Sequence, residues 1–438
     1  MRITASEVAR LTGGRLVGTD ATAPAVSFDT RTLRTGDAFV AIVDNRDGND
    51  FVGDAVRAGA SFALVTRGRS VEGITCIEVD DTTVALGQWG HHVRQLMTAQ
   101  VADRVVGITG SAGKTSTKNL VHAVLSRRFR HAHAAAHSLN NDIGVPVTLI
   151  NAPDDVDAVV IEMGMRGFHE IDRLCRIAEP VIGLITNIGD AHGERVGGPE
   201  GIARAKGELV EALPSHGTAI LNADDARCVA IGTRAGCRVL TYGSSAADLR
   251  WTARSTDGSG RVTVQFEHGG QTSLATPALP GVHMAANAAA AVLAGIACGL
   301  DLHEATLGVG QETAESGRMV WLELDDGRRV LDDTYNANSA SMLAALQVLA
   351  SAESGRKIAV LGRMSEVADP EAAHETVRRR AEELGIELLS LETDAYGDDG
   401  LSLDDVVGVL DRAEWNAVLV KGSRAAACER VVQRLLKR

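Results

Sequence analysis

The chain has 438 residues, more than one ordinary domain contains, so two or three domains with substantial cores are expected. A net charge of −13 disfavours nucleic-acid or anionic membrane partners, and six cysteines without Cys-x-x-Cys spacing disfavour a zinc site or a disulfide framework. No run approaches the roughly 18 consecutive apolar residues of a membrane span, and no apolar signal region opens the chain, so we expect a cytoplasmic protein acting on small molecules.

Residues 1–98 are predicted to form a small α/β domain. Two strand-like apolar runs and one amphipathic helix are expected at residues 39–43, 62–65 and 54–60, respectively. Ser27, Asp29 and Arg31 lie close together in a predicted loop after a strand. Arg31 is suited to grip a phosphate or carboxylate of a substrate, and a solvated charge pair in a turn is the alternative.

The stretch Thr109–Ser116 is predicted to join a strand to a helix. The β-branched run Val105–Ile108 precedes it, and apolar residues at helical spacing follow it. Glycines expose backbone N–H groups to an anion, Lys114 supplies a positive charge, and Thr115 can ligate Mg²⁺. The spacing departs from the strict Walker A pattern at Ile108, and a plain glycine-rich turn is the alternative interpretation. We expect phosphate contacts from Gly110, Ser111, Ala112, Gly113, Lys114, Thr115 and Ser116.

Over residues 99–315, apolar runs alternate with helical patterns as in a parallel sheet with crossover helices. Two predicted strands, at 158–161 and 181–185, end in polar residues, the first at Glu162. Because the carboxyl ends of parallel strands share one edge, these residues are expected to converge with the phosphate loop and favour a metal site. A single carboxylate at a strand end is more often a cap or an ion-pair partner.

Further along the same region, residues 240–280 alternate polar and apolar side chains and predict hairpins appended to the domain, and an alanine-rich helix follows. Considered singly, His192 suggests a polar loop residue and Lys206 a surface lysine. Residues 316–438 again alternate strands and helices in a Rossmann-like manner. No Gly-x-Gly-x-x-Gly follows a strand there, which argues against a dinucleotide cofactor and a dehydrogenase.

Several of these motifs, in this order, resemble those of the Mur ligase family. They are the phosphate loop and the runs Asn140–Pro146, Glu162–Gly164, Thr186–His192, Ala203–Glu208, Asn222–Asp225, Asp332–Asn338 and Val420–Arg424. The resemblance implies an α/β fold with three domains: an N-terminal domain for a UDP-linked substrate, a central parallel-sheet, P-loop ATPase-like domain, and a Rossmann-like C-terminal domain for an amine. It also implies an ATP-dependent, ADP-forming amide ligase.

Within that family, the two C-terminal runs and the N-terminal run Ser27–Arg31 look most like those of members that join D-alanyl-D-alanine to a UDP-N-acetylmuramoyl tripeptide in peptidoglycan precursor synthesis. The resemblance implies a catalytic set of Lys114, Glu162, His192 and Lys206. Thr115 and Glu162 would hold one Mg²⁺, and His192 would hold a second with a carbamylated Lys206. ATP contacts are implied for Asn287, Arg318 and Asp333. Substrate contacts are expected from Ser27, Asp29, Arg31, Asn140, Asn141, Asn336, Asn338 and Arg363, and the chain is expected to be a monomer.

The sequence departs from the usual family pattern at the edges of the site. Asn49 replaces a histidine, Met284 an asparagine, Ser339 a proline and Arg363 an aspartate, and His137-Ser138 stands where Gly-Asn is common. A paralogue that forms an amide in a specialised metabolite is therefore the alternative function. A catalytically silent ATP-binding regulator is disfavoured by the intact catalytic set.

Overall fold

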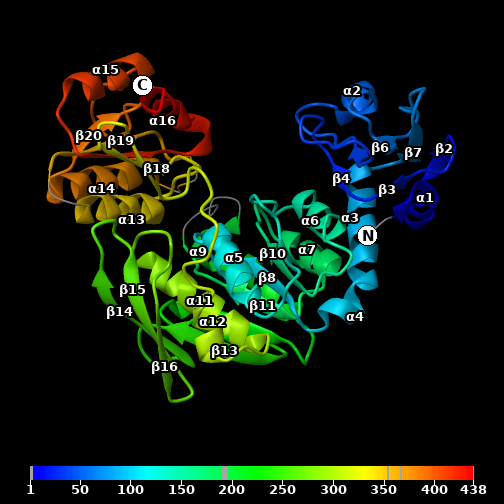
Figure 1. Cartoon of the computed structure of the whole chain (residues 1–438), viewed down its shortest axis with the longest axis horizontal. Helices are drawn as coiled ribbons and strands as arrows, with labels where there is room; N and C mark the ends of the chain where they lie inside the picture. The colour runs from blue at the N-terminus through cyan, green and yellow to red at the C-terminus, as the bar shows by residue number, and fades with distance from the viewer. Residues whose placement is uncertain (1–2, 190–195, 353–354, 366, 368, 438) are drawn as a thin grey trace.

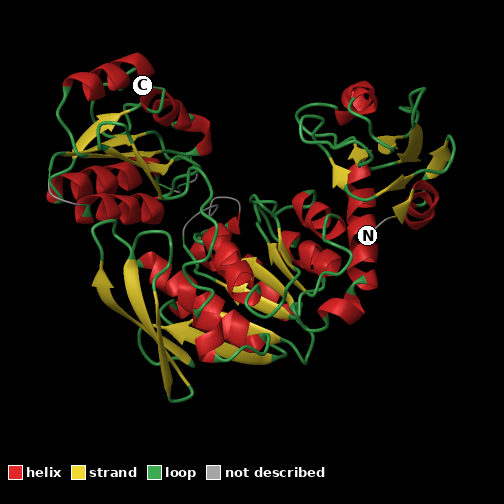
Figure 2. Cartoon of the chain, viewed as in Figure 1, coloured by secondary structure: helices red, strands yellow, loops and turns green. Residues whose placement is uncertain are grey.

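The computed structural model describes residues 3–189, 196–352, 355–365, 367 and 369–437. Three sheet-containing units follow one another along the chain, and Figure 1 shows the N-terminal and C-terminal units at opposite ends of the central one. Figure 2 shows that each unit combines a sheet with flanking helices. This is the α/β, three-unit architecture that the sequence predicts.

The N-terminal unit is built on a five-stranded sheet of order β2-β7-β6-β5-β4. Its elements are β1 (Ile3–Thr4), α1 (Ala5–Thr12), β2 (Arg15–Val17), β3 (Thr22–Ala23), β4 (Val26–Ser27), β5 (Ala38–Val40), η1 (Gly48–Phe51), α2 (Val52–Arg57), β6 (Phe62–Thr66), β7 (Thr75–Val79), α3 (Thr82–Leu96) and α4 (Thr98–Val101). Helix α3 begins where Asp81 accepts hydrogen bonds from the N–H groups of Thr83 and Val84. It also packs on the central unit, where a Cβ on Gly90 would lie 2.5 Å from the Pro146 side chain. The two units therefore share one continuous apolar core.

The central unit is a nine-stranded sheet of order β16-β15-β14-β13-β12-β11-β8-β10-β9. Its elements are β8 (Val105–Thr109), α5 (Lys114–Leu125), β9 (Ala132–Ala134), α6 (Gly144–Ile150), β10 (Ala158–Glu162), α7 (Glu170–Ala178), β11 (Ile182–Ile185), α9 (Pro199–Glu211), β12 (Thr218–Asn222), α10 (Ala226–Gly232), β13 (Arg238–Gly243), β14 (Leu249–Thr256), β15 (Val262–His268), β16 (Gln271–Ala275), α11 (His283–Ala297) and α12 (Leu302–Thr306). Strands β8 to β14 pair in parallel, whereas β14, β15 and β16 pair antiparallel. The predicted hairpins therefore extend the same sheet.

Both faces of this sheet are buried at its parallel strands β8, β10 and β11. Helices α5 and α11 cover one face with the core that contains Val106 and Ile108 of β8. The other face, which contains Val105, packs against α6, α7 and α9. Burial on both faces explains why β8, β10 and β11 are continuous apolar runs without alternation.

The C-terminal unit has a five-stranded sheet of order β17-β18-β21-β19-β20, in which β17 alone is antiparallel to its neighbour. Its elements are β17 (Val320–Glu323), β18 (Arg329–Asp333), α13 (Ser339–Ser351), β19 (Lys357–Leu361), α14 (Pro370–Glu383), β20 (Glu387–Ser390), α15 (Leu403–Arg412), β21 (Ala417–Lys421), η2 (Arg424–Ala426) and α16 (Glu429–Leu435). The parallel strands that the sequence predicts around 330, 358 and 418 are confirmed.

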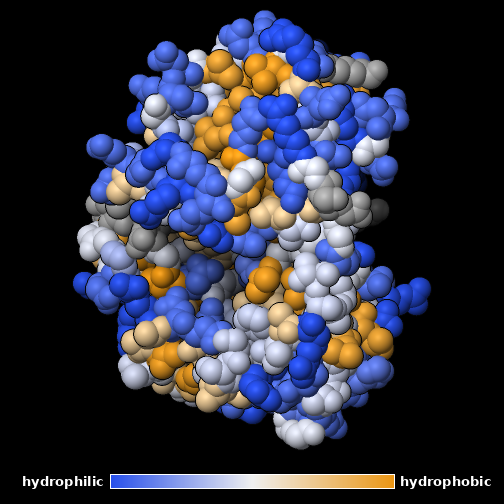
Figure 3. Space-filling model, turned by 90° about the vertical axis from the view of Figure 1, so that its left-hand side faces the viewer, coloured by the Kyte–Doolittle hydropathy of each residue, from blue (hydrophilic) through white to orange (hydrophobic). Residues whose placement is uncertain are grey.

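Seen from the side of the C-terminal unit, the surface is mostly hydrophilic with smaller apolar patches (Figure 3). All six cysteines are free thiols, as predicted. Within the part of the chain that the structure describes, no helix is long and apolar enough to cross a membrane.

Candidate active site

The phosphate loop lies between the carboxyl end of β8 and the first turn of α5, as predicted. Gly110 and Gly113 have φ angles of +153° and +80°, and a Cβ on Gly110 would lie 1.8 Å from Thr186 Oγ1. The adjoining strand end braces the loop, because Thr186 Oγ1 donates to Ala112 O at 2.7 Å and Asn187 Oδ1 accepts from Ala112 N at 3.0 Å. The loop is thus held in shape by side chains, with the helix N-terminus behind it.

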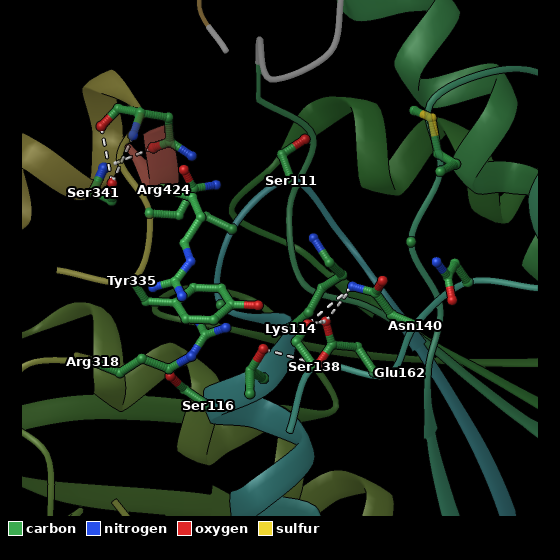
Figure 4. Close-up of a pocket in the computed structure, with 18 of the residues that line it drawn as sticks. Ser111, Lys114, Ser116, Ser138, Asn140, Glu162, Arg318, Tyr335, Ser341 and Arg424 are labelled. Carbon is green, nitrogen blue, oxygen red and sulfur yellow. Dashed lines mark hydrogen bonds between the residues drawn. The ribbon is translucent and has the colours of Figure 1, made fainter. Parts of the chain in front are cut away.

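Glu162 is the central carboxylate of the site and is 3% exposed. Its Oε2 accepts from Thr115 Oγ1 at 2.9 Å, and its Oε1 accepts from Ser138 Oγ at 2.7 Å and Asn140 Nδ2 at 2.8 Å (Figure 4). Burial opposes ionisation, but the Lys114 ammonium and these three hydrogen bonds together hold the pKa of Glu162 below its usual value. An ionised carboxylate beside a threonine hydroxyl is an oxygen donor pair of the kind Mg²⁺ prefers.

Lys206 lies inside the molecule, not on its surface, with 2% of its surface exposed. Burial, and then repulsion by Lys114, lower the pKa of its amine well below the ordinary value. Both lysines line the same cavity. His192, which the sequence pairs with Lys206, lies outside the described residues.

The C-terminal unit contributes a second wall. Asp333, at the end of β18, accepts from Lys421 Nζ at 2.5 Å and from Met319 N at 3.1 Å. Lys421 also donates to Asn336 O at 2.9 Å. Asn338 caps α13 by accepting from Ser341 N at 2.9 Å. The predicted residues at 333, 336 and 338 therefore lie on one ordered loop at the ends of β18 and β21.

Residues 315–318 connect the central and C-terminal units, and two contacts made by this segment were not predicted. The Arg318 guanidinium lies 3.8 Å from the centroid of the Tyr335 ring. Lys118 is 1% exposed and its Nζ lies 3.3 Å from Glu315 Oε1. Burial of Lys118 could not be predicted, because its position in the helical pattern after Lys114 is the same as that of an exposed lysine.

A cavity of about 810 Å³ lies between the wall formed by the central unit and the wall formed by the C-terminal unit. In Figure 4, Lys114, Ser138, Asn140 and Glu162 lie on one side, and Arg318, Tyr335, Ser341 and Arg424 lie on the other. The N-terminal unit adds Ile42, Val43, Asp44 and Thr83 to the lining. Of the predicted site residues, the cavity is lined by Ser111, Ala112, Gly113, Lys114, Thr115, Ser116, Asn140, Asn141, Glu162, Lys206, Asn287, Arg318, Asp333, Asn336 and Asn338.

Among the described residues, that lining does not include Gly110, Ser27, Asp29, Arg31 or Arg363. Arg31 is 86% exposed at its side chain and pairs with Asp29 at 2.6 Å. Hydrogen bonds from Arg31, opposed in part by burial, lower the pKa of Asp29. This pair is the solvated arrangement that the sequence allows as its alternative, and it leaves the Arg31 guanidinium accessible. Arg363 is an exposed residue.

Met284 and Asn287 lie one helical turn apart at the start of α11. Met284 is 1% exposed, and Asn287 Nδ2 lies 3.5 Å from its sulfur. A Cβ on Gly113 would lie 2.8 Å from Asn287 Oδ1, so Asn287 abuts the phosphate loop itself. Only glycine at 113 permits that approach.

Two family models and several known proteins match this chain. Residues 108–295 match the Mur ligase middle domain, and residues 317–438 match the Mur ligase glutamate ligase domain. The UDP-N-acetylmuramoyl-tripeptide–D-alanyl-D-alanine ligase of Escherichia coli K12 is 36% identical over 99% of this chain and 98% of its own length. The chain belongs to the Mur ligase family. The expected family is therefore confirmed, and with it an enzyme of the ligase class.

Further relatives agree with this family membership. The Bacillus subtilis protein of the same name is 35% identical over 79% of this chain and 74% of its own. The crystal structure of MurF from Acinetobacter baumannii superimposes with a TM-score of 0.87 and 28% identity, covering 100% of this chain and 99% of that one. This Mur ligase therefore shares sequence with the Escherichia coli protein over 99% of its length and fold with the Acinetobacter baumannii protein over 100% of it.

Proposed function

We propose that this Mur ligase joins D-alanyl-D-alanine to a UDP-N-acetylmuramoyl tripeptide, converting ATP to ADP and phosphate. The observation that supports it most is the single cavity shared by the phosphate loop, Glu162 and the β18–α13 loop of the C-terminal unit. Such a cavity can hold a triphosphate, a carboxylate and an amine together. The names of the Escherichia coli and Bacillus subtilis relatives state this pair of substrates for those proteins.

The proposed reaction runs through an acyl phosphate. A carboxylate is a poor electrophile at neutral pH, so phosphoryl transfer from ATP activates it, and the amine then displaces phosphate. The Lys114 ammonium and the N–H groups of the phosphate loop neutralise charge on the transferring group. Arg318 and Asp333 approach ATP from the C-terminal unit, and approach of this unit excludes the water that would hydrolyse the intermediate.

Magnesium suits the residues that line the central wall. Thr115 Oγ1 and the ionised Glu162 carboxylate would hold one ion, and His192 with a modified Lys206 a second. Bound Mg²⁺ supplies charge neutralisation to phosphate oxygens. The chain's own contribution is the hydrogen bonding from Ser138 and Asn140, which orients Glu162 and keeps it ionised.

We further propose that Lys206 is carbamylated. A lysine ammonium has no lone pair for a metal, whereas a carbamate is an anion with two oxygens. Carbon dioxide adds to the neutral amine, a C–N bond forms and one N–H proton is released to solvent, and burial of Lys206 favours that neutral form. Burial thus disfavours the ammonium form of Lys206 and favours the neutral amine that can be carbamylated to give a metal ligand.

The remaining assignments are part of the same proposal. Asn287 contacts adenine, Asn140 and Asn141 lie beside the reacting carboxylate, and Asn336 and Asn338 receive the amine. Ser27, Asp29 and Arg31 bind the UDP moiety. Arg363, which the sequence also assigns to the amine, does not line the cavity, so its side chain has no assigned contact with the amine. Residues 1–98, 99–315 and 316–438 are the proposed domains of a cytoplasmic monomer.

A paralogue acting in specialised metabolism is the second candidate, suggested by the departures from the family pattern at 284, 339 and 363. The deciding experiment is mass spectrometry of products after incubation with ATP, Mg²⁺, the UDP-muramoyl tripeptide and a panel of amines. Formation of the D-alanyl-D-alanine adduct supports the first candidate. Exclusive use of other acids or amines supports the second, and phosphate release with no acceptable amine contradicts both.

A further inference from the structure

The amine substrate proposed for this enzyme also has a carboxylate, and a binding site for that carboxylate is expected to supply a positively charged side chain. A dipeptide spans at most about 7 Å between its ends, so a cation that binds the carboxylate while the amine reacts must lie on the cavity wall. Among the described lining residues, the C-terminal unit supplies three arginine or lysine side chains, those of Arg318, Lys421 and Arg424.

Two of these cations are held by partners and are largely buried, with side-chain exposures of 2% for Lys421 and 22% for Arg318. Lys421 is 2% exposed at its side chain and is paired with Asp333 at 2.5 Å. Arg318 lies over the Tyr335 ring at 3.8 Å and has Glu315 Oε2 3.6 Å from its Nε. Moving either guanidinium or ammonium to a substrate would break an existing pair.

Arg424 is differently placed. Its side chain is 70% exposed, and its Nη1 donates to Glu429 Oε1 at 3.5 Å, a long ion pair on the exposed surface. The backbone that carries it is fixed, because the buried Ser423 donates its N–H to Arg363 O at 3.1 Å and its hydroxyl bonds Ser365 Oγ at 2.8 Å. A rigid base with a guanidinium held only by an exposed ion pair is suited to bidentate binding of a carboxylate, because such a pair contributes little and is readily exchanged.

We infer that Arg424 is the residue that selects for the carboxylate of the incoming amine. This inference rests on the proposed function and names the cation that gives its amine site specificity. Arg424 lies at the end of β21, beside the strand end that carries Asp333 and the loop with Asn336 and Asn338. The amine end of the substrate then points from this wall toward the phosphate loop across the cavity.

The test compares D-alanyl-D-alanine with its C-terminal amide in steady-state kinetics. The wild-type enzyme is expected to prefer the free carboxylate by about tenfold or more in kcat/KM, as the loss of a charge-assisted hydrogen bond predicts. In Arg424→Gln the KM for the dipeptide rises by a similar factor, the amide is unaffected, and the KM values for ATP and the UDP-tripeptide stay the same. Arg424→Lys keeps part of the preference.

Two further arginine variants make the test specific. Arg434→Gln, which removes an exposed arginine paired with Asp404 on the outer surface, is the matched control and is expected to behave as wild type. Arg363→Gln examines the rival cation that the sequence suggests. Loss of the preference in Arg363→Gln with retention in Arg424→Gln would overturn the inference, as would equal loss of both amines in Arg424→Gln.

Failure of the proposed function has a different signature. If the wild type rejects D-alanyl-D-alanine but accepts another amino acid or peptide, the substrate is wrong, and that amine and its amide are compared in Arg424→Gln in the same way. If the wild type accepts only amines without a carboxylate, the inference fails together with the substrate.

Discussion

Glu315 is expected to stabilise the segment that joins the central and C-terminal units, because it neutralises a buried lysine on α5. Lys118 Nζ donates to Ala135 O at 2.6 Å and His137 O at 3.2 Å and lies 3.3 Å from Glu315 Oε1. Asn119 Nδ2 also donates to Glu315 at 3.1 Å. Glu315→Gln keeps an oxygen acceptor but leaves an ammonium uncompensated in a side chain that is 1% exposed.

Breaking a buried ion pair by removing one partner costs about 3–5 kcal/mol, and the two carbonyl acceptors and the retained amide oxygen reduce this to about 2 kcal/mol here. Lys118→Met is also destabilising because it leaves those carbonyls without their donor. The double variant is expected to be more stable than the sum of the single losses predicts, by about 1 kcal/mol or more.

The assay is urea unfolding combined with hydrogen exchange of α5 peptides, since a chain of three units need not unfold in one step. Glu382→Gln is the control, because Glu382 pairs with Arg378 on the surface and its loss is expected to cost about 0.5 kcal/mol or less. Additive losses in the double variant, or equal effects of Glu315→Gln and Glu382→Gln, would refute the buried-pair reasoning.

Four shorter predictions concern the reaction centre. In Lys114→Ala, the activation free energy of acyl-phosphate formation is expected to rise by about 3 kcal/mol or more, while calorimetry still detects binding of the UDP-tripeptide. Equal loss of both would contradict the assignment of the two substrates to different units. Lys206→Ala loses most activity and regains part with short carboxylates, and an unmodified amine in the intact, active protein by native mass spectrometry would contradict carbamylation. Met284→Asn raises the preference for ATP over GTP by up to about tenfold, since an amide can add one hydrogen bond near Asn287; an unchanged ratio assigns selectivity elsewhere. The pKa of Glu162 is lower in the folded protein than its ordinary value of 4.5, so ionised Glu162 stabilises the fold at pH values above 4.5, and this contribution is lost as the pH falls through the lower folded-state pKa. In Glu162→Gln, the free energy of unfolding is therefore expected to depend less on pH on the acid side. Identical pH profiles of stability in the wild type and the variant would contradict this.

The central unit was predictable from sequence because its signals are local. An apolar run, a glycine-rich turn and an amphipathic helix identify β8, the loop and α5 without knowledge of any distant residue. Glu162 was predictable as a site residue because parallel strands bring their carboxyl ends to one edge. These are consequences of topology and hold whatever the surrounding packing.

Other parts of the site depend on contacts that the sequence does not encode locally. Lys206 and Lys118 have patterns of ordinary helix lysines, yet both are buried against other elements. Helix α3 was not anticipated, because its buried residues pack partly on α6 and α7 of another unit. The proximity of Arg424 to the phosphate-loop wall likewise follows only from how the C-terminal unit meets the central one.

Two of the departures from the family pattern are accommodated by local structure. Asn49, in place of a histidine, is 6% exposed and accepts from Thr66 N at 3.1 Å while donating to Asp47 at 2.6 Å, so it holds a turn of the N-terminal unit together. Ser339 occupies the first position of α13, where proline is favoured because its N–H is not needed. The Asn338 cap and the reciprocal bond to Ser341 still start that helix.

The substitutions at 49 and 339 are therefore compatible with the turn that Asp47 and Asn49 form and with the start of α13. They are weak evidence that the substrate has changed. Met284 is buried against Asn287, which abuts Gly113, so its effect is expected at the phosphate-loop end of the cavity. Arg363 is exposed, and its carbonyl, not its side chain, holds Ser423 in place beside Arg424. A backbone role tolerates either aspartate or arginine at 363, which favours the D-alanyl-D-alanine ligase over the specialised-metabolite paralogue.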